Sequence, residues 1–178
     1  MPLLEREEQV ELVAGEIVPR AMPTVVHGVS QLKLGSQLDP FHRRPGGPRG
    51  PGGWWIMSEV DTYYPQTDEV FRHDLSGYRR ELHEARPSGF PVRTRPDWVC
   101  EIASPGSGRR DHVEKQRTLH AHGVPHYWLL DPASEVLTVL RWREDGYLLV
   151  LSAAPGELVR AEPFEAIELD LAEVFGRE

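Results

Sequence analysis

The chain has 178 residues, of which 39% are hydrophobic and 27% are charged, and this size and composition fit a single globular domain over residues 1–178. Mean hydropathy is −0.45, and no apolar run approaches the roughly 20 residues that a membrane-spanning helix needs, so we predict no membrane partner. The acidic start MPLLEREEQVEL is unlike a secretory signal, and the single Cys100 excludes an internal disulfide. We therefore expect a cytoplasmic protein.

The net charge of −8 opposes bulk attraction to nucleic acid. The acidity is concentrated near the end of the chain: the net charge is −2 over residues 1–38, +1 over 39–117 and −7 over 118–178. Lysine is rare, with 18 arginines against only Lys33 and Lys115. Because arginine carries the general basic charge here, each lysine is a candidate for a specific role.

The first third predicts a hairpin followed by a helix. VELVAGEIVP contains two short β-type runs around Ala14-Gly15. Thr24 is a plausible N-cap for an amphipathic helix over residues 24–38. The apolar residues at helical spacing in this segment are Val25, Val29 and Leu32.

The next segments predict loops and two strands. Nine of the 15 positions in residues 39–53 are Gly or Pro, which favours a mobile loop over a helix or a central strand. WWIMSEVDTYYP and DEVFRHDLSGYRR are β-type segments with a turn near residues 65–68, and residues 80–95 resemble an exposed loop.

A strand, a helix and a strand follow in close succession. PDWVCEIAS predicts the first strand, a helix runs from about Gly108 to His122 and ends at Gly123, and HYWLLDP predicts the second strand. This order is typical of a βαβ unit with parallel strands. The remainder predicts antiparallel hairpins, with one turn at Glu144-Asp145-Gly146, and a short terminal helix in LDLAEVFG. The fold class is therefore α/β, with a mixed sheet and flanking antiparallel hairpins.

The strand PDWVCEIAS places two carboxylates on one face. Residues two apart share a face of a strand, so Asp97 and Glu101 lie on one side. The other side, formed by Trp98, Cys100 and Ile102, is typical of a core. Burying acids on a central strand is unfavourable unless partners or a metal ion compensate their charge.

Two further residues complete a possible catalytic set. Lys115 lies on the predicted helix that packs back on the sheet, from where it can reach Glu101, and Asp74 lies on a neighbouring strand. Carboxylates that hold Mg²⁺ and a lysine that orients water are what metal-assisted phosphodiester hydrolysis requires.

The run RPDWVCEIASPGSGRRDHVEKQRTLHAHGVPHYWLLDP resembles the signature of the Uma2 family, whose members are similar to restriction endonucleases. VELVAGEIVPRAMPTVVHG resembles the family's opening hairpin and helix, and DEVFRHDL its first catalytic strand, so the resemblance covers roughly residues 8–150. It implies a restriction-endonuclease-like core and a metal-dependent endonuclease that cleaves duplex DNA with Mg²⁺ or Mn²⁺. Cleavage of both strands calls for two sites, which suggests a homodimer.

The resemblance also assigns roles by residue. It implies that Asp74 and Glu101 bind metal and that Lys115 is the catalytic lysine, while Asp97 is a possible third ligand. Three positions depart from the family or superfamily pattern: Ala103 stands where endonucleases of this type carry lysine, His73 where many relatives have Pro, and His120 where relatives often have Tyr.

Simpler interpretations remain open for each residue. Glu101 could bond to backbone or to an arginine, Asp97 could stabilise a turn, and Lys115 could pair with Asp111 on the helix surface. Arg109 and Arg110 could bind substrate phosphate or be ordinary solvated charges. His120, His122 and His126 lack a fourth ligand, which disfavours zinc. Alternative functions are a non-catalytic nucleic-acid-binding or assembly module and a nuclease acting on structured RNA or repair intermediates.

Overall fold

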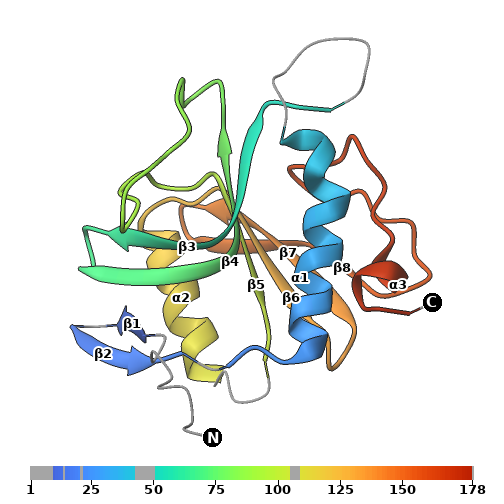
Figure 1. Cartoon of the computed structure of the whole chain (residues 1–178), viewed down its shortest axis with the longest axis horizontal. Coiled ribbons are helices and arrows are strands. Elements are labelled where there is room, and N and C mark those ends of the chain that lie inside the picture. The colour runs from blue at the N-terminus through green and yellow to red at the C-terminus, as the bar shows by residue number, and fades with distance from the viewer. Residues whose placement is uncertain (1–9, 14, 21, 43–50, 105–108, 178) are drawn as a thin grey trace, which may run out of the picture.

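A computed structural model describes residues 10–177, apart from 14, 21, 43–50, 105–108 and the side chains of 109–112. Its framework is a mixed sheet of eight strands in the order β2-β1-β4-β5-β6-β7-β8, with β3 paired to β4 (Figure 1). The strands are β1 Val10–Val13, β2 Glu16–Pro19, β3 Trp54–Tyr64, β4 Glu69–Arg79, β5 Trp98–Ile102, β6 His126–Asp131, β7 Val136–Arg143 and β8 Gly146–Ala153.

Three α-helices accompany the sheet: α1 Val25–Leu38, α2 Arg109–Ala121 and α3 Leu171–Val174. α1 and α3 lie side by side at one end of the molecule (Figure 1). A short 3₁₀ helix, Asp39–Phe41, directly follows α1. No helix in the described part of the chain is long and apolar enough to cross a membrane.

The sheet is buried on both faces, which creates two separate cores. The α1-side core joins α1 and α3 to alternate residues of β5, namely Trp98, Cys100 and Ile102. The α2-side core contains Val99 from the opposite face of β5 together with Leu119 of α2. All five residues of β5 are buried, as expected for a central strand covered on both sides.

The βαβ unit and the hairpins agree with the sequence predictions. β5 and β6 pair in parallel, with Trp98 opposite His126, and α2 connects them. The hairpins β1–β2, β3–β4 and β7–β8 are antiparallel. Thr24 caps α1 as predicted, because its Oγ1 accepts a hydrogen bond from the backbone N–H of His27.

Two sequence predictions are wrong. The apolar stripe predicted for α1 does not form its buried face: Val25 and Leu32 are 84% and 72% exposed, and the buried residues are His27, Ser30, Leu34 and Leu38. A stripe of three residues was too short to fix the face of this helix. The segment 39–53 begins with a 3₁₀ helix and not with a loop, because Pro40 suits a first helical turn. Residues 43–50 lie outside the described residues.

We expect His126 to make stability depend on pH. Burial, together with Arg79 and Arg141, lowers the pKa of His126 from 6.5 to about 4. The unfolded chain therefore binds a proton at a higher pH than the folded chain, and stability falls as pH decreases from about 6.5 to about 4. At 1.36 kcal/mol per pKa unit, the loss is on the order of 2–3 kcal/mol. Urea unfolding at pH 7 and pH 4 should show a smaller loss for His126→Gln, and equal losses would contradict this role.

Candidate active site

The candidate site lies where β4 separates from β5. The ladder between these strands stops at Leu75 and Cys100, so the next residues along each strand are Asp74 and Glu101. The backbone N–H of Ile102 donates instead to Asp74 Oδ2, at 2.7 Å. A side-chain carboxylate thus replaces a backbone acceptor at this point.

β4 also bends at this point. Phe71 and Leu75 are four residues apart and should share a face of a regular strand, yet Phe71 packs in the α2-side core and Leu75 in the α1-side core. On β3, Glu59 lies between the residues paired to Leu75 and His73 and has a positive φ of 54°. Strained non-glycine backbone of this kind is concentrated at functional sites.

Asp74 is surrounded by basic side chains. Its own side chain is 1% exposed, and its Oδ1 accepts a hydrogen bond from Arg20 Nη2. His27 Nε2 lies 3.2 Å from the same oxygen. Arg20 also donates through Nη1 to Glu59 Oε2, at 2.7 Å. A buried carboxylate is thereby paired with a permanent positive charge.

Glu101 belongs to a second polar group on the α2 side of the sheet. Its Oε2 lies 3.2 Å from Lys115 Nζ, and its Oε1 lies 2.6 Å from His73 Nδ1. Burial alone would raise the pKa of Glu101, but attraction to Lys115 and the hydrogen bond with His73 outweigh burial and lower the pKa to about 2. Glu101 is therefore ionised at neutral pH.

Lys115 and His73 connect Glu101 to further buried groups. Lys115 Nζ donates to Glu11 Oε1 on β1, at 2.9 Å, so the lysine links two buried carboxylates. His73 Nε2 lies 2.6 Å from the hydroxyl of Tyr64, whose pKa burial raises well above its usual value. Five residues from β1, β3, β4, β5 and α2 thus form one hydrogen-bonded chain.

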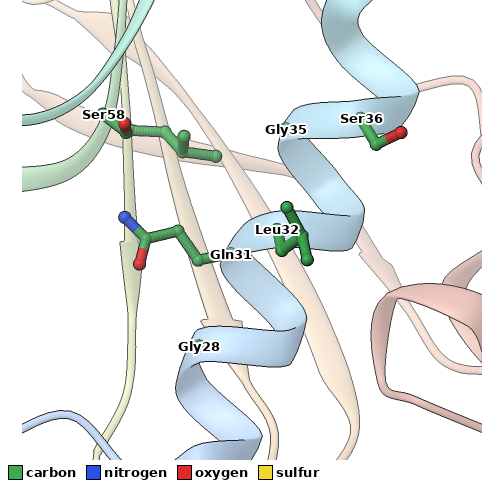
Figure 2. Close-up of a pocket in the computed structure, with 7 residues that line it drawn as sticks. Gly28, Gln31, Leu32, Gly35, Ser36 and Ser58 are labelled. Atoms are coloured by element: carbon green, nitrogen blue, oxygen red, sulfur yellow. The ribbon is translucent and has the colours of Figure 1, made fainter.

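A groove opens between α1 and β3 beside Asp74. It encloses about 430 Å³ and is lined by Gly28, Gln31, Leu32, Gly35, Ser36, Ser58 and Leu75. Figure 2 shows the side chain of Gln31 extending from α1 toward the strand side of this groove. Gln31 Nε2 donates to the backbone O of Asp74 and to Glu59 Oε1, each at 2.9 Å. The groove therefore adjoins the polar cluster around Asp74.

The residues around Asp74 include a possible metal-binding set. Ligand atoms of His27, Glu59 and Asp74 lie within 4.8 Å of one another. Two carboxylates and an imidazole are suitable donors for a divalent ion.

Comparison with known proteins gives the family. A family model described as "Putative restriction endonuclease", Uma2, matches residues 1–172. The chain belongs to the Uma2 family. The solved structures include a similar protein from Anabaena variabilis, described as a putative nuclease, with a TM-score of 0.73 and 21% sequence identity over 98% of this chain and 94% of the other. At this identity the similarity establishes the shared fold. A search of curated proteins found no match.

The structure of this Uma2 chain brings together three of the residues singled out from the sequence. Asp74, Glu101 and Lys115 come from β4, β5 and α2 and lie around the end of β5. The alternative pairing of Lys115 with Asp111 and the roles of Arg109 and Arg110 depend on side chains outside the described ones. Cys100 is fully buried in the α1-side core, and burial raises the pKa of its thiol, as expected for a packing residue.

Asp97 lies apart from this group. Four residues along a strand separate it from Glu101, about 13 Å between backbone positions. Its Oδ2 accepts the backbone N–H of Arg79 at 2.8 Å, and its carboxylate faces Arg95 and His83 at 3.3 and 3.4 Å. One ion cannot contact both Asp97 and Glu101 across that distance, so Asp97 is omitted from the ligand set proposed below.

Several polar residues of the Uma2 site were missed by the sequence interpretation, namely Glu11, Arg20, His27, Glu59 and Tyr64. Two of them carry a usable signal. Glu11 shares a strand face with the buried Val13, and His27 shares a helix face with the buried Leu34. A charged or titratable residue on the same face as a core residue is the signal in both cases. Glu59 and Arg20 carry no such signal, because their positions depend on the register between β3 and β4 and on the path of the chain after β2.

Proposed function

We propose that this Uma2 protein is a metal-dependent endonuclease that hydrolyses phosphodiester bonds of duplex DNA. The observation that carries the proposal is the convergence of Asp74, Glu101 and Lys115 from three elements at the end of β5. Membership of a family described as "Putative restriction endonuclease" supports the reaction class.

In this proposal Asp74 and Glu101 hold Mg²⁺ or Mn²⁺, whose preference for oxygen ligands both carboxylates satisfy. When bound, the ion supplies a hydroxide-like nucleophile and offsets negative charge on the phosphate. Lys115, buried beside Glu101, orients the attacking water, and Glu11 and Glu101 fix the position of its ammonium group. Arg109 and Arg110 at the start of α2 are proposed to contact substrate phosphates.

The charge distribution predicts how substrate binds. A net charge of −8 disfavours bulk attraction to DNA, so affinity should be weak and salt-sensitive and should depend on the bound ion. Cleavage of both strands requires two sites, so we also propose a homodimer. Light scattering of the purified protein measures this directly.

The proposed activity can be tested on a panel of nucleic acids. Supercoiled plasmid, linear duplex, single-stranded DNA and RNA are incubated with the full chain and Mg²⁺, Mn²⁺ or EDTA. We expect ion-dependent cleavage that is fastest on duplex DNA and absent in EDTA. Cleavage of RNA alone would contradict duplex DNA as the substrate. If neither ion supported cleavage of any of these substrates, the proposed endonuclease activity would be contradicted.

One observation favours a second candidate function. Arg20, Lys115 and His73 already contact the carboxylates of Asp74 and Glu101, as they would in a structural network. The alternative is therefore a non-catalytic nucleic-acid-binding or assembly module on the same fold. Calorimetric titration with Mn²⁺ separates the two functions, because only the nuclease requires stoichiometric ion binding.

A further inference from the structure

Three residues outside the family's catalytic set surround Asp74: His27 on α1, Glu59 on β3 and Arg20 after β2. They lie on the α1 side of the bend in β4, whereas Lys115 and Glu11 approach Glu101 from the α2 side. Both groups contain an imidazole, but both ring nitrogens of His73 in the second group lie 2.6 Å from a partner, Glu101 Oε1 and the Tyr64 hydroxyl. In the first group, donor atoms of His27, Glu59 and Asp74 all lie within 4.8 Å of one another.

His27 has a buried nitrogen without a hydrogen bond. The residue is 4% exposed, and its Nε2 makes no hydrogen bond with any residue that the structure describes, although it lies 3.2 Å from Asp74 Oδ1. The other ring nitrogen, Nδ1, lies 2.8 Å from Ser104 Oγ, which fixes the orientation of the ring. In a metal-binding histidine, one ring nitrogen is usually held by a hydrogen bond and the other is left to bind the metal, as the contacts of the His27 ring allow.

Glu59 is held toward the same point by its backbone and by Gln31. Its φ of 54° is unfavourable for a residue with a side chain and is tolerated where the surroundings impose it. Gln31 Nε2 donates to Glu59 Oε1, at 2.9 Å. The Glu59 side chain is 42% exposed, so the cluster is open to solvent on this side, where an ion can enter.

Arg20 supplies a positive charge between the two carboxylates. Its Nη1 donates to Glu59 Oε2 at 2.7 Å, and its Nη2 donates to Asp74 Oδ1. A guanidinium that bridges these two groups is in the position that a cation bound to both would take. Arg20 and a metal ion would therefore compete for the same oxygens.

We propose that His27 Nε2, Glu59 and Asp74 form a site for a divalent transition metal, with Mn²⁺ preferred over Mg²⁺, and that Arg20 leaves these carboxylates when the ion binds. The proposal rests on the proposed function in one respect, which is that Asp74 is a metal ligand. The preference follows from the imidazole, since Mg²⁺ favours oxygen-only sites and imidazole suits transition metals. The freed Arg20 is then available to bind a phosphate, for which its planar fork is suited.

Mn²⁺ affinity of the full chain, measured by calorimetry and by the loss of the free-ion EPR signal, tests the ligand set. Mutation of a residue that only hydrogen-bonds to a metal ligand typically weakens metal affinity by about 10–100-fold. Loss of a ligand itself, in His27→Gln or in Glu59→Gln, should therefore weaken Mn²⁺ binding by at least about 10-fold. His120→Gln, on the surface of α2, is the matched control and should bind as the wild type does. Arg20→Gln should bind Mn²⁺ more tightly because the competing cation is removed. Unchanged affinity in His27→Gln and Glu59→Gln would overturn the proposal, and so would weaker binding in Arg20→Gln.

A spectroscopic readout identifies the nitrogen ligand without any activity measurement. Electron spin echo modulation from ¹⁴N should appear in the Mn²⁺-loaded wild type and in His120→Gln and disappear in His27→Gln. Modulation that persists in His27→Gln, with circular dichroism showing a folded protein, would overturn the site. The proposed nuclease function is contradicted by a different result, namely cleavage of DNA by Asp74→Asn at the wild-type rate. Failure of the metal site and failure of the nuclease function can therefore be distinguished.

Discussion

Replacement of Lys115 by Met should destabilise the fold by about 3–5 kcal/mol, because it leaves Glu11 and Glu101 buried without their shared counter-charge. Domains of this size are stable by only about 5–15 kcal/mol, so much of the margin would be lost. The Lys115 side chain is 5% exposed, and those of Glu11 and Glu101 are 3% and 6% exposed. Urea denaturation at pH 7 measures the change.

The second lysine provides the matched control. Lys33 pairs with Glu173 on the surface, with side chains 42% and 48% exposed, so Lys33→Met should change stability by at most about 1 kcal/mol. The combination of Lys115→Met with Glu11→Gln and Glu101→Gln should recover part of the loss, because the uncompensated charges are then absent. An effect of Lys115→Met no larger than that of Lys33→Met would contradict the buried network.

Asp74→Asn should reduce ion-dependent cleavage by roughly 10³-fold, which corresponds to about 4 kcal/mol of metal-dependent stabilisation of the transition state. The amide oxygen of Asn can still accept the backbone N–H of Ile102, so the end of the β4–β5 ladder should persist. Initial rates on supercoiled plasmid with saturating Mn²⁺ measure the loss of activity.

Asp61 is the control for Asp74. It is also largely buried and paired with an arginine, with Oδ1 and Oδ2 2.9 and 2.7 Å from Arg72, but it lies outside the metal-binding set. Asp61→Asn should therefore retain the wild-type cleavage rate at temperatures where it is folded. Equal rates for Asp74→Asn and the wild type would remove Asp74 from the mechanism.

The fold of this chain was largely predictable because its signals are local. Gly123 ends α2 with a φ of 64°, and the alternation of Trp98, Cys100 and Ile102 defines one face of β5. The buried face of α1 was not predictable from the apolar stripe of Val25, Val29 and Leu32, because the buried side includes two polar residues, His27 and Ser30. His27 contacts Asp74 on β4 and Ser104, and such tertiary contacts between residues distant in sequence favour the observed side of the helix.

The site was predictable to a smaller extent. Glu101 and Lys115 lie in the βαβ unit, whose order and pairing follow from the sequence pattern. Asp74 lies on β4, outside that unit, and was singled out through the resemblance to the Uma2 family. Glu59, by contrast, lies opposite Asp74 because of the register between β3 and β4, which pairs Ser58 with Leu75 and Val60 with His73. The two-residue period of each strand does not give the register between strands. The links from His73 to Tyr64 and from Lys115 to Glu11 likewise join residues that are distant in sequence.

The central claim is that Asp74 is the ligand of a catalytic divalent ion. A crystal structure of the full chain soaked in Mn²⁺, with diffraction recorded near the manganese absorption edge, tests this claim directly. The account predicts an anomalous peak in direct contact with the Asp74 carboxylate, with Arg20 moved away from Glu59. An empty position at Asp74, with Arg20 still bridging the two carboxylates at millimolar Mn²⁺, would contradict it.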